Sequence, residues 1–278
     1  MHQRIIRRVA TIALALVTAL AGVHQARAAG AVNINSCQTL SIGNTTYKLT
    51  ADLTSCGNCL VVAADKITID LQGHSIANTI CKGSNAAITD NGSSLDVITV
   101  KNGSVGGYRI GVNLRLSTRV SVLGVTASGN SAEGIYAGPQ ALIKSSVTAN
   151  NADAGIRVGN RGQVQQCNSN DNGVSGIEVD GDNCLVTMNT ANANGTDGIV
   201  LAGNKCTVSY NTANGNGNVG IAFVVGTGEL ITQNVALNNS AFDYEFGCPS
   251  DVTNNDSTNG FPASYLLFGT GCHTVNNN

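Results

Sequence analysis

Apolar residues recur along this chain at a nearly constant interval. The phrase Gly-Ile-x-Val, or a close variant of it, begins at Gly155, Gly176, Gly198 and Gly220, so the repeat is 21 to 22 residues long. Within a repeat, apolar and polar residues alternate, and this period of two predicts short β-strands. A repeat of this length cannot bury its own apolar face, so neighbouring repeats must stack on one another.

The repeat leaves no room for a helix in each unit, which disfavours leucine-rich and helical solenoids. We therefore predict an all-β fold, a single-stranded parallel β-helix of about eight to ten coils with capped ends. Each strand would pair in register with its copy in the next coil, roughly 4.8 Å along the axis. A right-handed coil follows from the strong bias of parallel crossovers.

Stacking in register predicts columns of equivalent residues. The expected inward columns are Ile135, Ile156, Ile177, Ile199 and Ile221, and Val164, Val186 and Val208. The expected corner columns are Asn168, Asn189 and Asn211, and Asn172, Asn194 and Asn216. Asparagine tolerates a positive φ at such a corner, and its amide can bond to the copies above and below.

The first 28 residues have the features of a signal peptide. A basic end precedes an apolar run over 9–22, and Ala26-Arg27-Ala28 matches the small-x-small cleavage rule. The apolar run is too short for a transmembrane span. We therefore expect a secreted or periplasmic protein. The mature part would be one domain, with an N-terminal cap and first coils over 29–85, regular coils over 86–241 and a C-terminal cap over 242–278.

All nine cysteines lie after the predicted cleavage site, where export permits disulfide bonds. We expect a Cys248–Cys272 bond and pairing among the four early cysteines, Cys37, Cys56, Cys59 and Cys81. The Cys56-Gly-Asn-Cys59 segment could instead serve thiol or zinc chemistry, but no βαβ pattern surrounds it and only two histidines remain after cleavage.

Three further cysteines lie within the coils. Cys184 and Cys206 are one repeat apart, and we expect them to stack as small buried apolar residues, although their spacing also permits a bond. The odd number of cysteines requires at least one free thiol or an intermolecular bond.

Charge excludes some classes of partner. Cleavage after Ala28 leaves 11 basic and 17 acidic residues, a formal charge of −6, and the chain has no tryptophan. An acidic chain with scattered basic residues is a poor binder of nucleic acid. No later apolar run is long enough to span a membrane. We expect a monomer without a cofactor, whose partner is a polysaccharide or a cell-envelope glycan.

Four segments resemble a known family in the expected order. They are Leu-Thr-Ala-Asp-Leu over 49–53, the run over 64–76, Val-Lys-Asn-Gly over 100–103 and Gly-Thr-Gly-Cys over 269–272. Together they resemble secreted bacterial right-handed parallel β-helix repeat proteins. The resemblance implies the fold. The wider pectate-lyase-like superfamily includes lyases, hydrolases, esterases and epimerases that act on acidic polysaccharides, so the fold alone does not assign a function.

The motifs of those enzymes are missing. Polygalacturonase-like Asn-Thr-Asp, Asp-Asp and Gly-His-Gly elements do not occur, and neither does the Asp-Pro-His-Asp pattern of alginate epimerases. The sequence therefore favours a protein that binds glycan or cell-envelope material, or a structural protein of the envelope, without recognisable catalysis. The alternative is an enzyme, either a lyase or a hydrolase of acidic polysaccharide, and only a lyase would require calcium.

One surface cluster is a candidate ligand site. In Gly-Ile-x-Val the x side chain points outward, opposite the buried apolar pair. Successive coils place Tyr136, Arg157 and Glu178 there, with Arg115, Asp180 and Asp182 on the flanks. An aromatic ring and a guanidinium could contact a sugar and its acidic group. The alternative is a solvated face with an ordinary Arg157–Glu178 pair, worth about 0.2–1 kcal/mol.

Overall fold

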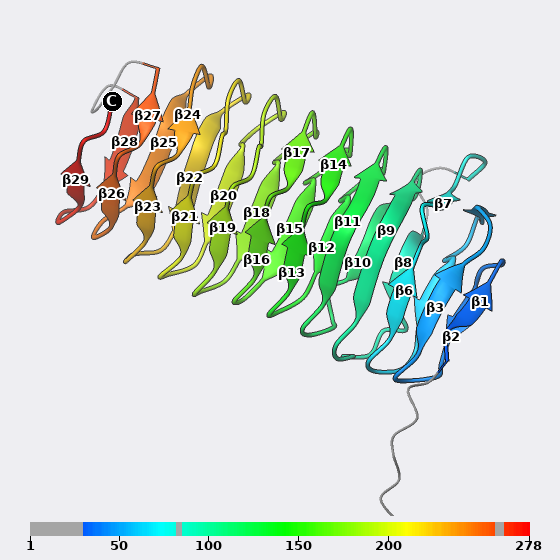
Figure 1. The fold of residues 1–278 in the computed structure, drawn as a ribbon. Coiled ribbons are helices and arrows are strands. Elements are labelled where there is room, and N and C mark those ends of the chain that lie inside the picture. The colour runs from blue at the N-terminus through cyan, green and yellow to red at the C-terminus, as the bar shows by residue number, and fades with distance from the viewer. Residues whose placement is uncertain (1–29, 82–84, 259–263) are drawn as a thin grey trace, which may run out of the picture. The chain divides into compact units, whose positions relative to one another are not determined.

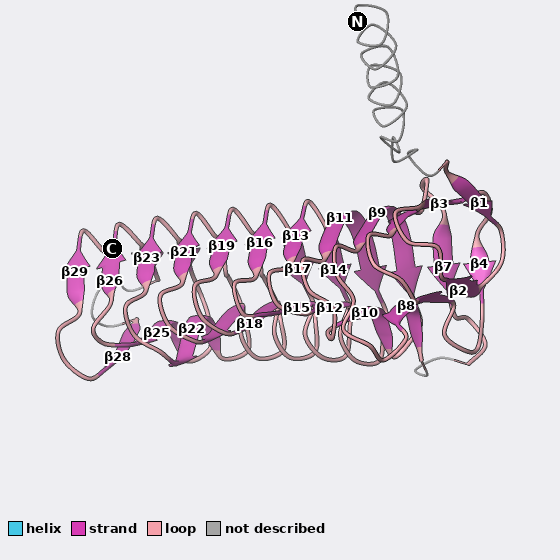
Figure 2. Ribbon diagram, turned by 90° about the horizontal axis from the view of Figure 1, so that it is seen from below, coloured by secondary structure: helices cyan, strands magenta, loops and turns pink. Residues whose placement is uncertain are grey.

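A computed structural model describes residues 30–81, 85–258 and 264–278. The predicted signal peptide lies outside these residues. Residues 31–278 form one compact unit, and every regular element described in it is a β-strand. None of the described residues belongs to an apolar helix with the length that a bilayer requires. Figures 1 and 2 show the coils following one another from the N-terminal to the C-terminal end.

One face of the solenoid is an 11-stranded sheet in which all neighbours are parallel. Its order is β2 (Gln38–Leu40), β5 (Leu60–Val62), β8 (Ala86–Asp90), β10 (Ile110–Leu114), β12 (Ile135–Ala137), β15 (Ile156–Gly159), β18 (Ile177–Asp180), β20 (Ile199–Ala202), β22 (Val219–Val225), β25 (Phe242–Gly247) and β28 (Tyr265–Phe268). Each coil contributes one strand, so the predicted all-β parallel β-helix is confirmed.

A 16-stranded sheet forms the opposing wall. Its main path is β1 (Val32–Ile34), β3 (Thr46–Leu49), β6 (Thr68–Asp70), β9 (Thr99–Gly106), β11 (Ser121–Ser128), β13 (Leu142–Lys144), β16 (Gln163–Gln165), β19 (Leu185–Thr187), β21 (Thr207–Ser209), β23 (Leu230–Thr232), β26 (Asp251–Thr253) and β29 (His273–Val275). Its side branches are β4 (Leu53–Thr54) with β7 (Ser75–Ala77), and β14 (Val147–Ala149) with β17 (Asn168–Asn170). A separate pair joins β24 (Val235–Ala236) to β27 (Asp256–Ser257).

The core consists of the predicted apolar columns. Ile135, Ile156, Ile177, Ile199 and Ile221 are paired in register from β12 to β22, and all five are fully buried. Val164, Val186 and Val208 form the second column from β16 to β21. Each buried side chain of this kind contributes about 1.5–3 kcal/mol. The alternation of apolar and polar residues therefore fixes the register of the coils, since a slip of one residue would expose every isoleucine.

One predicted asparagine column differs from the structure. Asn168 lies in the column of Thr190 and Thr212, outside the ladder. The residue that precedes Asn189 in the ladder is Cys167, whose backbone N–H donates to the Asn189 amide oxygen. The completed ladder contains Asn189, Asn211, Asn234, Asn255 and Asn277. The prediction failed because the repeat is 21 or 22 residues long. Counted back from Asn189, this spacing fits Asn168 and Cys167 equally well.

The second asparagine column is confirmed and extends beyond the predicted residues. It contains Asn130, Asn151, Asn172, Asn194, Asn216 and Asn239. The expected positive φ is absent from both ladders. It falls on residues just before them, including Met188 and Tyr210. These asparagines are therefore selected for hydrogen bonding between coils and not for backbone conformation.

Strand pairing continues past the boundary at residue 242, where we expect the C-terminal cap to begin. β25 pairs with both β22 and β28, and β26 pairs with β29. Tyr244 and Phe246 are fully buried and contact Tyr265, so these aromatic rings extend the core. Phe261 lies outside the described residues. Strand pairing therefore does not change at residue 242.

Four disulfide bonds join adjacent coils. They are Cys37–Cys59, Cys56–Cys81, Cys184–Cys206 and Cys248–Cys272. The predicted bond near the C-terminus and the pairing among the early cysteines are confirmed.

Cys56 and Cys59 belong to different bonds, which excludes a dithiol or zinc role for the segment. The expectation that Cys184 and Cys206 stack without bonding is wrong, because in-register cysteines of adjacent coils lie close enough to bridge, with Cα atoms 4.5 Å apart.

We predict that the protein processed at Ala28 has one free thiol. Cys167 is the remaining cysteine, and burial raises the pKa of its thiol to about 11. It should therefore react slowly with a thiol reagent in the native protein and fully in denaturant. Three thiols per chain in denaturant, with peptide mapping that places two of them at Cys184 and Cys206, would contradict the pairing.

Candidate functional site

The predicted candidate site lies on the outer face of the 11-stranded sheet. Asn113 in β10, Tyr136 in β12, Arg157 in β15 and Glu178 in β18 are paired in register. The residues that flank each of them along the strand are buried, while these four side chains are partly exposed. The alternation of the strands therefore places them in one outward column.

Arg157 is at the centre of this cluster. Its guanidinium lies over the ring of Tyr136, with Cζ 5.2 Å from the ring centroid. On its other side Nε donates to the Asp180 carboxylate at 2.7 Å, and Nη1 is 3.4 Å from the Glu178 carboxylate. The stronger contact is thus with Asp180 and not with Glu178, the partner considered from the sequence. The structure brings together Tyr136, Arg157, Glu178 and Asp180.

The charges of the cluster depend on burial. Desolvation raises the pKa of Glu178, and the nearby Asp153 and Asp180 act in the same direction, while Arg157 acts against it. Burial opposes the charge of Arg157, but hydrogen bonding and attraction by Asp180, together with Glu178, hold its pKa above the ordinary value. Arg157 therefore stays charged, and Glu178 keeps its proton to a higher pH than a solvated glutamate.

The two other predicted residues are not part of the cluster. Arg115 is exposed, and within the described residues no ion pair joins it to the other four. Asp182 lies at a corner, where its carboxylate accepts from the backbone N–H of Asn204 at 2.7 Å and from the amide of Asn204 at 3.0 Å. Asp182 therefore joins two coils and is not directed toward Arg157.

The outer column continues beyond the predicted residues. Val200, Ala222, Glu245 and Leu266 follow Glu178 in register. Beside them a β-bulge in β22 shifts the register between Leu201 and Ala202 and leaves Val224 66% exposed. Val224, Phe268 and Glu245 line an open hollow of about 460 Å³. This hollow could not be predicted from the sequence, because the bulge interrupts the regular register of the repeat there.

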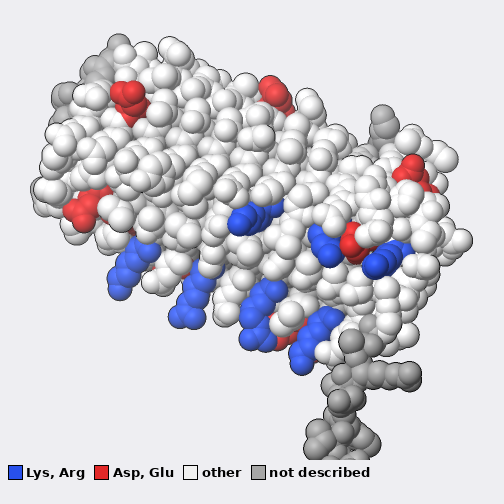
Figure 3. All heavy atoms as spheres, in the orientation of Figure 1, with Lys and Arg blue, Asp and Glu red and all other residues white. Residues whose placement is uncertain are grey.

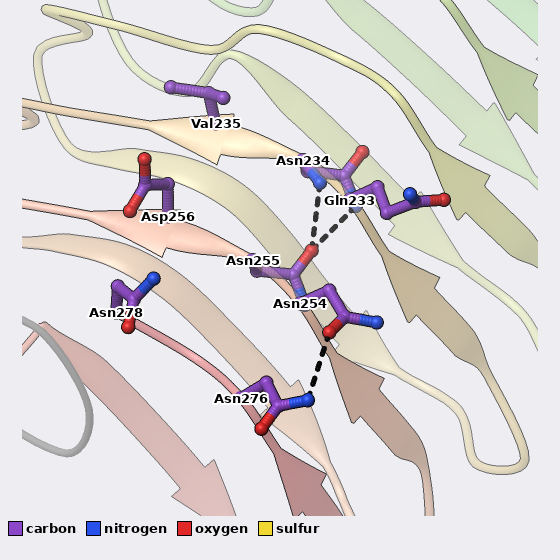
Figure 4. A pocket seen from close by; sticks show the side chains of 8 residues that line it. All are labelled: Gln233, Asn234, Val235, Asn254, Asn255, Asp256, Asn276 and Asn278. Atoms are coloured by element: carbon purple, nitrogen blue, oxygen red, sulfur yellow. Dashed lines mark hydrogen bonds between the residues drawn. The ribbon is translucent and has the colours of Figure 1, made fainter.

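A second open hollow, of about 580 Å³, lies at the C-terminal end of the asparagine ladder (Figure 4). It is lined by Gln233, Asn234, Val235, Asn254, Asn255, Asp256, Asn276 and Asn278. Asn234 donates to Asn255, and Asn276 donates to Asn254. Among the described residues that line it, Asp256 is the single titratable one, so this part of the lining lacks the converging ionisable groups that are typical of an active site.

Metal chemistry has no visible basis in the described part of the chain. Among residues 30–81, 85–258 and 264–278, no three histidine, cysteine or acidic side chains are grouped as a metal site. The carboxylates of Glu178 and Asp180 are instead held by Arg157.

A family model described as "Right handed beta helix region" matches residues 138–278, just over half of the chain. The chain belongs to the right-handed β-helix family. A comparison with curated proteins found no match to this chain. The match agrees with the hand and the fold predicted from the sequence.

Solved structures share this fold. The A-module of the mannuronan C-5 epimerase AlgE6 from Azotobacter vinelandii has a TM-score of 0.72 at 12% identity, over 88% of this chain and 86% of the module. The A-module of AlgE4 from the same organism scores 0.56 at 12% identity, over 88% and 87%. The enzymatically active domain of bacteriophage CBA120 tailspike protein 2 scores 0.58 at 11% identity, over 89% of this chain and 42% of that domain. At these identities the likeness concerns the fold.

We predict that Glu178→Gln removes a pH-dependent loss of stability. The folded-state pKa of Glu178 lies above its ordinary 4.5, so the folded protein binds the proton more tightly than the unfolded chain. The contribution of Glu178 to the free energy of unfolding should therefore fall as the pH rises from about 4.5 through the folded-state pKa. Denaturant unfolding of both proteins at a series of pH values measures this. A wild-type advantage over the variant that grows with pH would contradict it.

Proposed function

We propose that this protein binds an extended glycan along the outer face of the 11-stranded sheet, without catalysis. The observation that carries the proposal is that one outward column connects two candidate contact regions. The polar cluster around Arg157 and the hollow beside Phe268 lie on the same face, and between them the column passes through Val200, which is partly exposed, and Ala222, which is buried.

The dimensions of this surface suit a chain of several sugars. Six coil steps separate Tyr136 from Leu266, which at the strand spacing is roughly 29 Å. Carboxylate oxygens and the guanidinium offer acceptors and donors for hydroxyl groups at one end. At the other end, Phe268 is 50% exposed and offers an apolar ring face.

The electrostatics of this face favour a neutral glycan over an acidic one. Two nitrogen atoms of Arg157 already contact carboxylates, so the guanidinium cannot act as a free bidentate clamp. Its stacking on Tyr136 also covers one face of that ring. Arg157 already has two acidic neighbours, Glu178 and Asp180, and Asp153 lies close enough to Glu178 to raise its pKa, so the cluster disfavours a further anion.

The comparisons and the cysteines give general support. The similar structures named above are epimerases of mannuronan and a phage tailspike domain. This chain lacks the Asp-Pro-His-Asp pattern of alginate epimerases, which is why binding is proposed and not epimerisation. The four disulfide bonds are in keeping with export to the periplasm or the cell exterior.

One observation favours a hydrolase as the second candidate. Glu178 has a raised pKa and Asp180 lies beside the same arginine, and glycosidases use one protonated and one ionised carboxyl group. The release of reducing ends from pectin, alginate or neutral glucans would favour this alternative, particularly if Glu178→Gln abolished it. The appearance of unsaturated product with calcium would indicate a lyase instead.

We predict that Tyr136→Ala/Arg157→Ala weakens binding to neutral oligosaccharides on a glycan array about tenfold or more, because it removes the central stacked pair. The matched control, Gln163→Ala/Gln165→Ala, changes the outer face of the other sheet and should bind like the wild type. The control should stay within about 0.5 kcal/mol of wild-type stability. Unchanged binding by the Tyr136/Arg157 variant, with its fold intact, would mean that the cluster is only a solvated face.

A further inference from the structure

Basic side chains form a regular row along one corner of the solenoid. The corner lies just before the strands of the 16-stranded sheet, where backbone hydrogen bonds align Lys66, Val97, Arg119, Gln140, Arg161, Asn183 and Lys205 in successive coils. Each of these residues has a left-handed backbone, with φ between 50° and 59°, and each side chain is exposed. Every second coil therefore presents one cation.

The spacing of this basic row follows from the stack. Equivalent Cα atoms of adjacent coils are 4.4 Å apart at Cys37–Cys59 and 4.9 Å apart at Cys248–Cys272. Cations on alternate coils are thus about 10 Å apart, and the four of them extend over roughly 29 Å. Figure 3 shows Lys and Arg side chains projecting at intervals along the lower edge of the molecule. At the next corner along the coil, which includes Asn102, Gln166 and Gln233, none of the described residues in the left-handed position is charged.

Three acidic residues accompany the four cations and leave the row with a net charge of +1. Asp65, Asp96 and Asp182 occupy the preceding position in their coils. Asp65 and Asp182 each accept a hydrogen bond from a backbone N–H of the next coil. Asp96 forms an ion pair with Arg119. Within the described residues, Lys66, Arg161 and Lys205 have no carboxylate within ion-pair distance.

We propose that the basic row binds an extended anionic polysaccharide of the polyuronate type, in which the acidic group of about every second sugar meets a cation of the row. This site is separate from the face proposed above for a neutral glycan and does not depend on it. Nucleic acid fits less well, because phosphates follow one another at about 3.4 Å along each strand of a duplex. The acidic protein offers no long-range attraction, so affinity comes from the row itself and falls with salt.

The test is a triple substitution, Lys66→Gln/Arg161→Gln/Lys205→Gln. Glutamine is suitable because Gln140 already has this left-handed conformation in the same row. The control, Lys48→Gln/Arg109→Gln/Lys144→Gln, removes the same number of charges elsewhere. Binding to a polyuronate oligosaccharide at low salt should fall about tenfold in the row variant and remain near wild type in the control. Asp96→Asn, which releases Arg119, should strengthen binding severalfold.

Three outcomes would overturn the proposal. They are no binding of polyuronate by the wild type, an equal loss in both triple variants, and tighter binding of single-stranded DNA than of polyuronate. The Tyr136→Ala/Arg157→Ala protein separates the two sites, because it should retain polyuronate binding even where it loses the neutral glycan. Loss of polyuronate binding in that protein, with the row intact, would assign the anion to the sheet face and also count against the row.

Discussion

The hydrogen bonds of buried asparagine side chains between coils are the interaction on which this solenoid depends. In the ladder, the amide oxygen of Asn211 accepts from both the backbone N–H and the side-chain amide of Asn189, each at 2.9 Å. Its own amide group donates to the carbonyl of Val186 and to Asn234. Both bonding groups of the amide are satisfied in a fully buried position. The Asn211 side chain thereby pairs the backbone N–H of Asn189 and the backbone carbonyl of Val186, which would otherwise be buried without a partner.

The same stacking produces the functional surfaces. Because every coil repeats the same path, a side chain chosen at one position becomes a column with a fixed spacing. The outer column of the 11-stranded sheet and the basic row at the corner are both built in this way. A rigid array of this kind orders few side chains on binding, and it suits ligands that repeat along their length.

The sequence predicts the part of the structure that repeats. The isoleucine and valine columns could be placed because the alternation has to agree with burial in every coil. The contacts of Arg157 could not be predicted. The repeat spacing brings Arg157 near Tyr136, Glu178 and Asp180, but it does not decide which carboxylate Arg157 contacts more closely. The hollow beside Val224 arises from a bulge, and the period of the sequence carries no information there.

The basic row was also hidden from the sequence. The seven aligned positions, of which four are basic, follow one another at intervals of 31, 22, 21, 21, 22 and 22 residues, and the first interval contains an insertion before Val97. In the linear chain they are scattered lysines and arginines in an acidic protein. Their alignment follows only from the hydrogen bonds that join the corners, and these depend on the register of the whole stack.

Substitution of Asn211 by alanine tests the role of the ladder most directly. The change leaves the backbone N–H of Asn189 and the carbonyl of Val186 without their partners in the core, and Asn211 itself has no positive φ that alanine would strain. We predict a loss of about 3 kcal/mol in the free energy of unfolding, against about 0.5 kcal/mol or less for the exposed Gln163→Ala. An Asn211→Ala protein as stable as the Gln163→Ala protein would contradict the account.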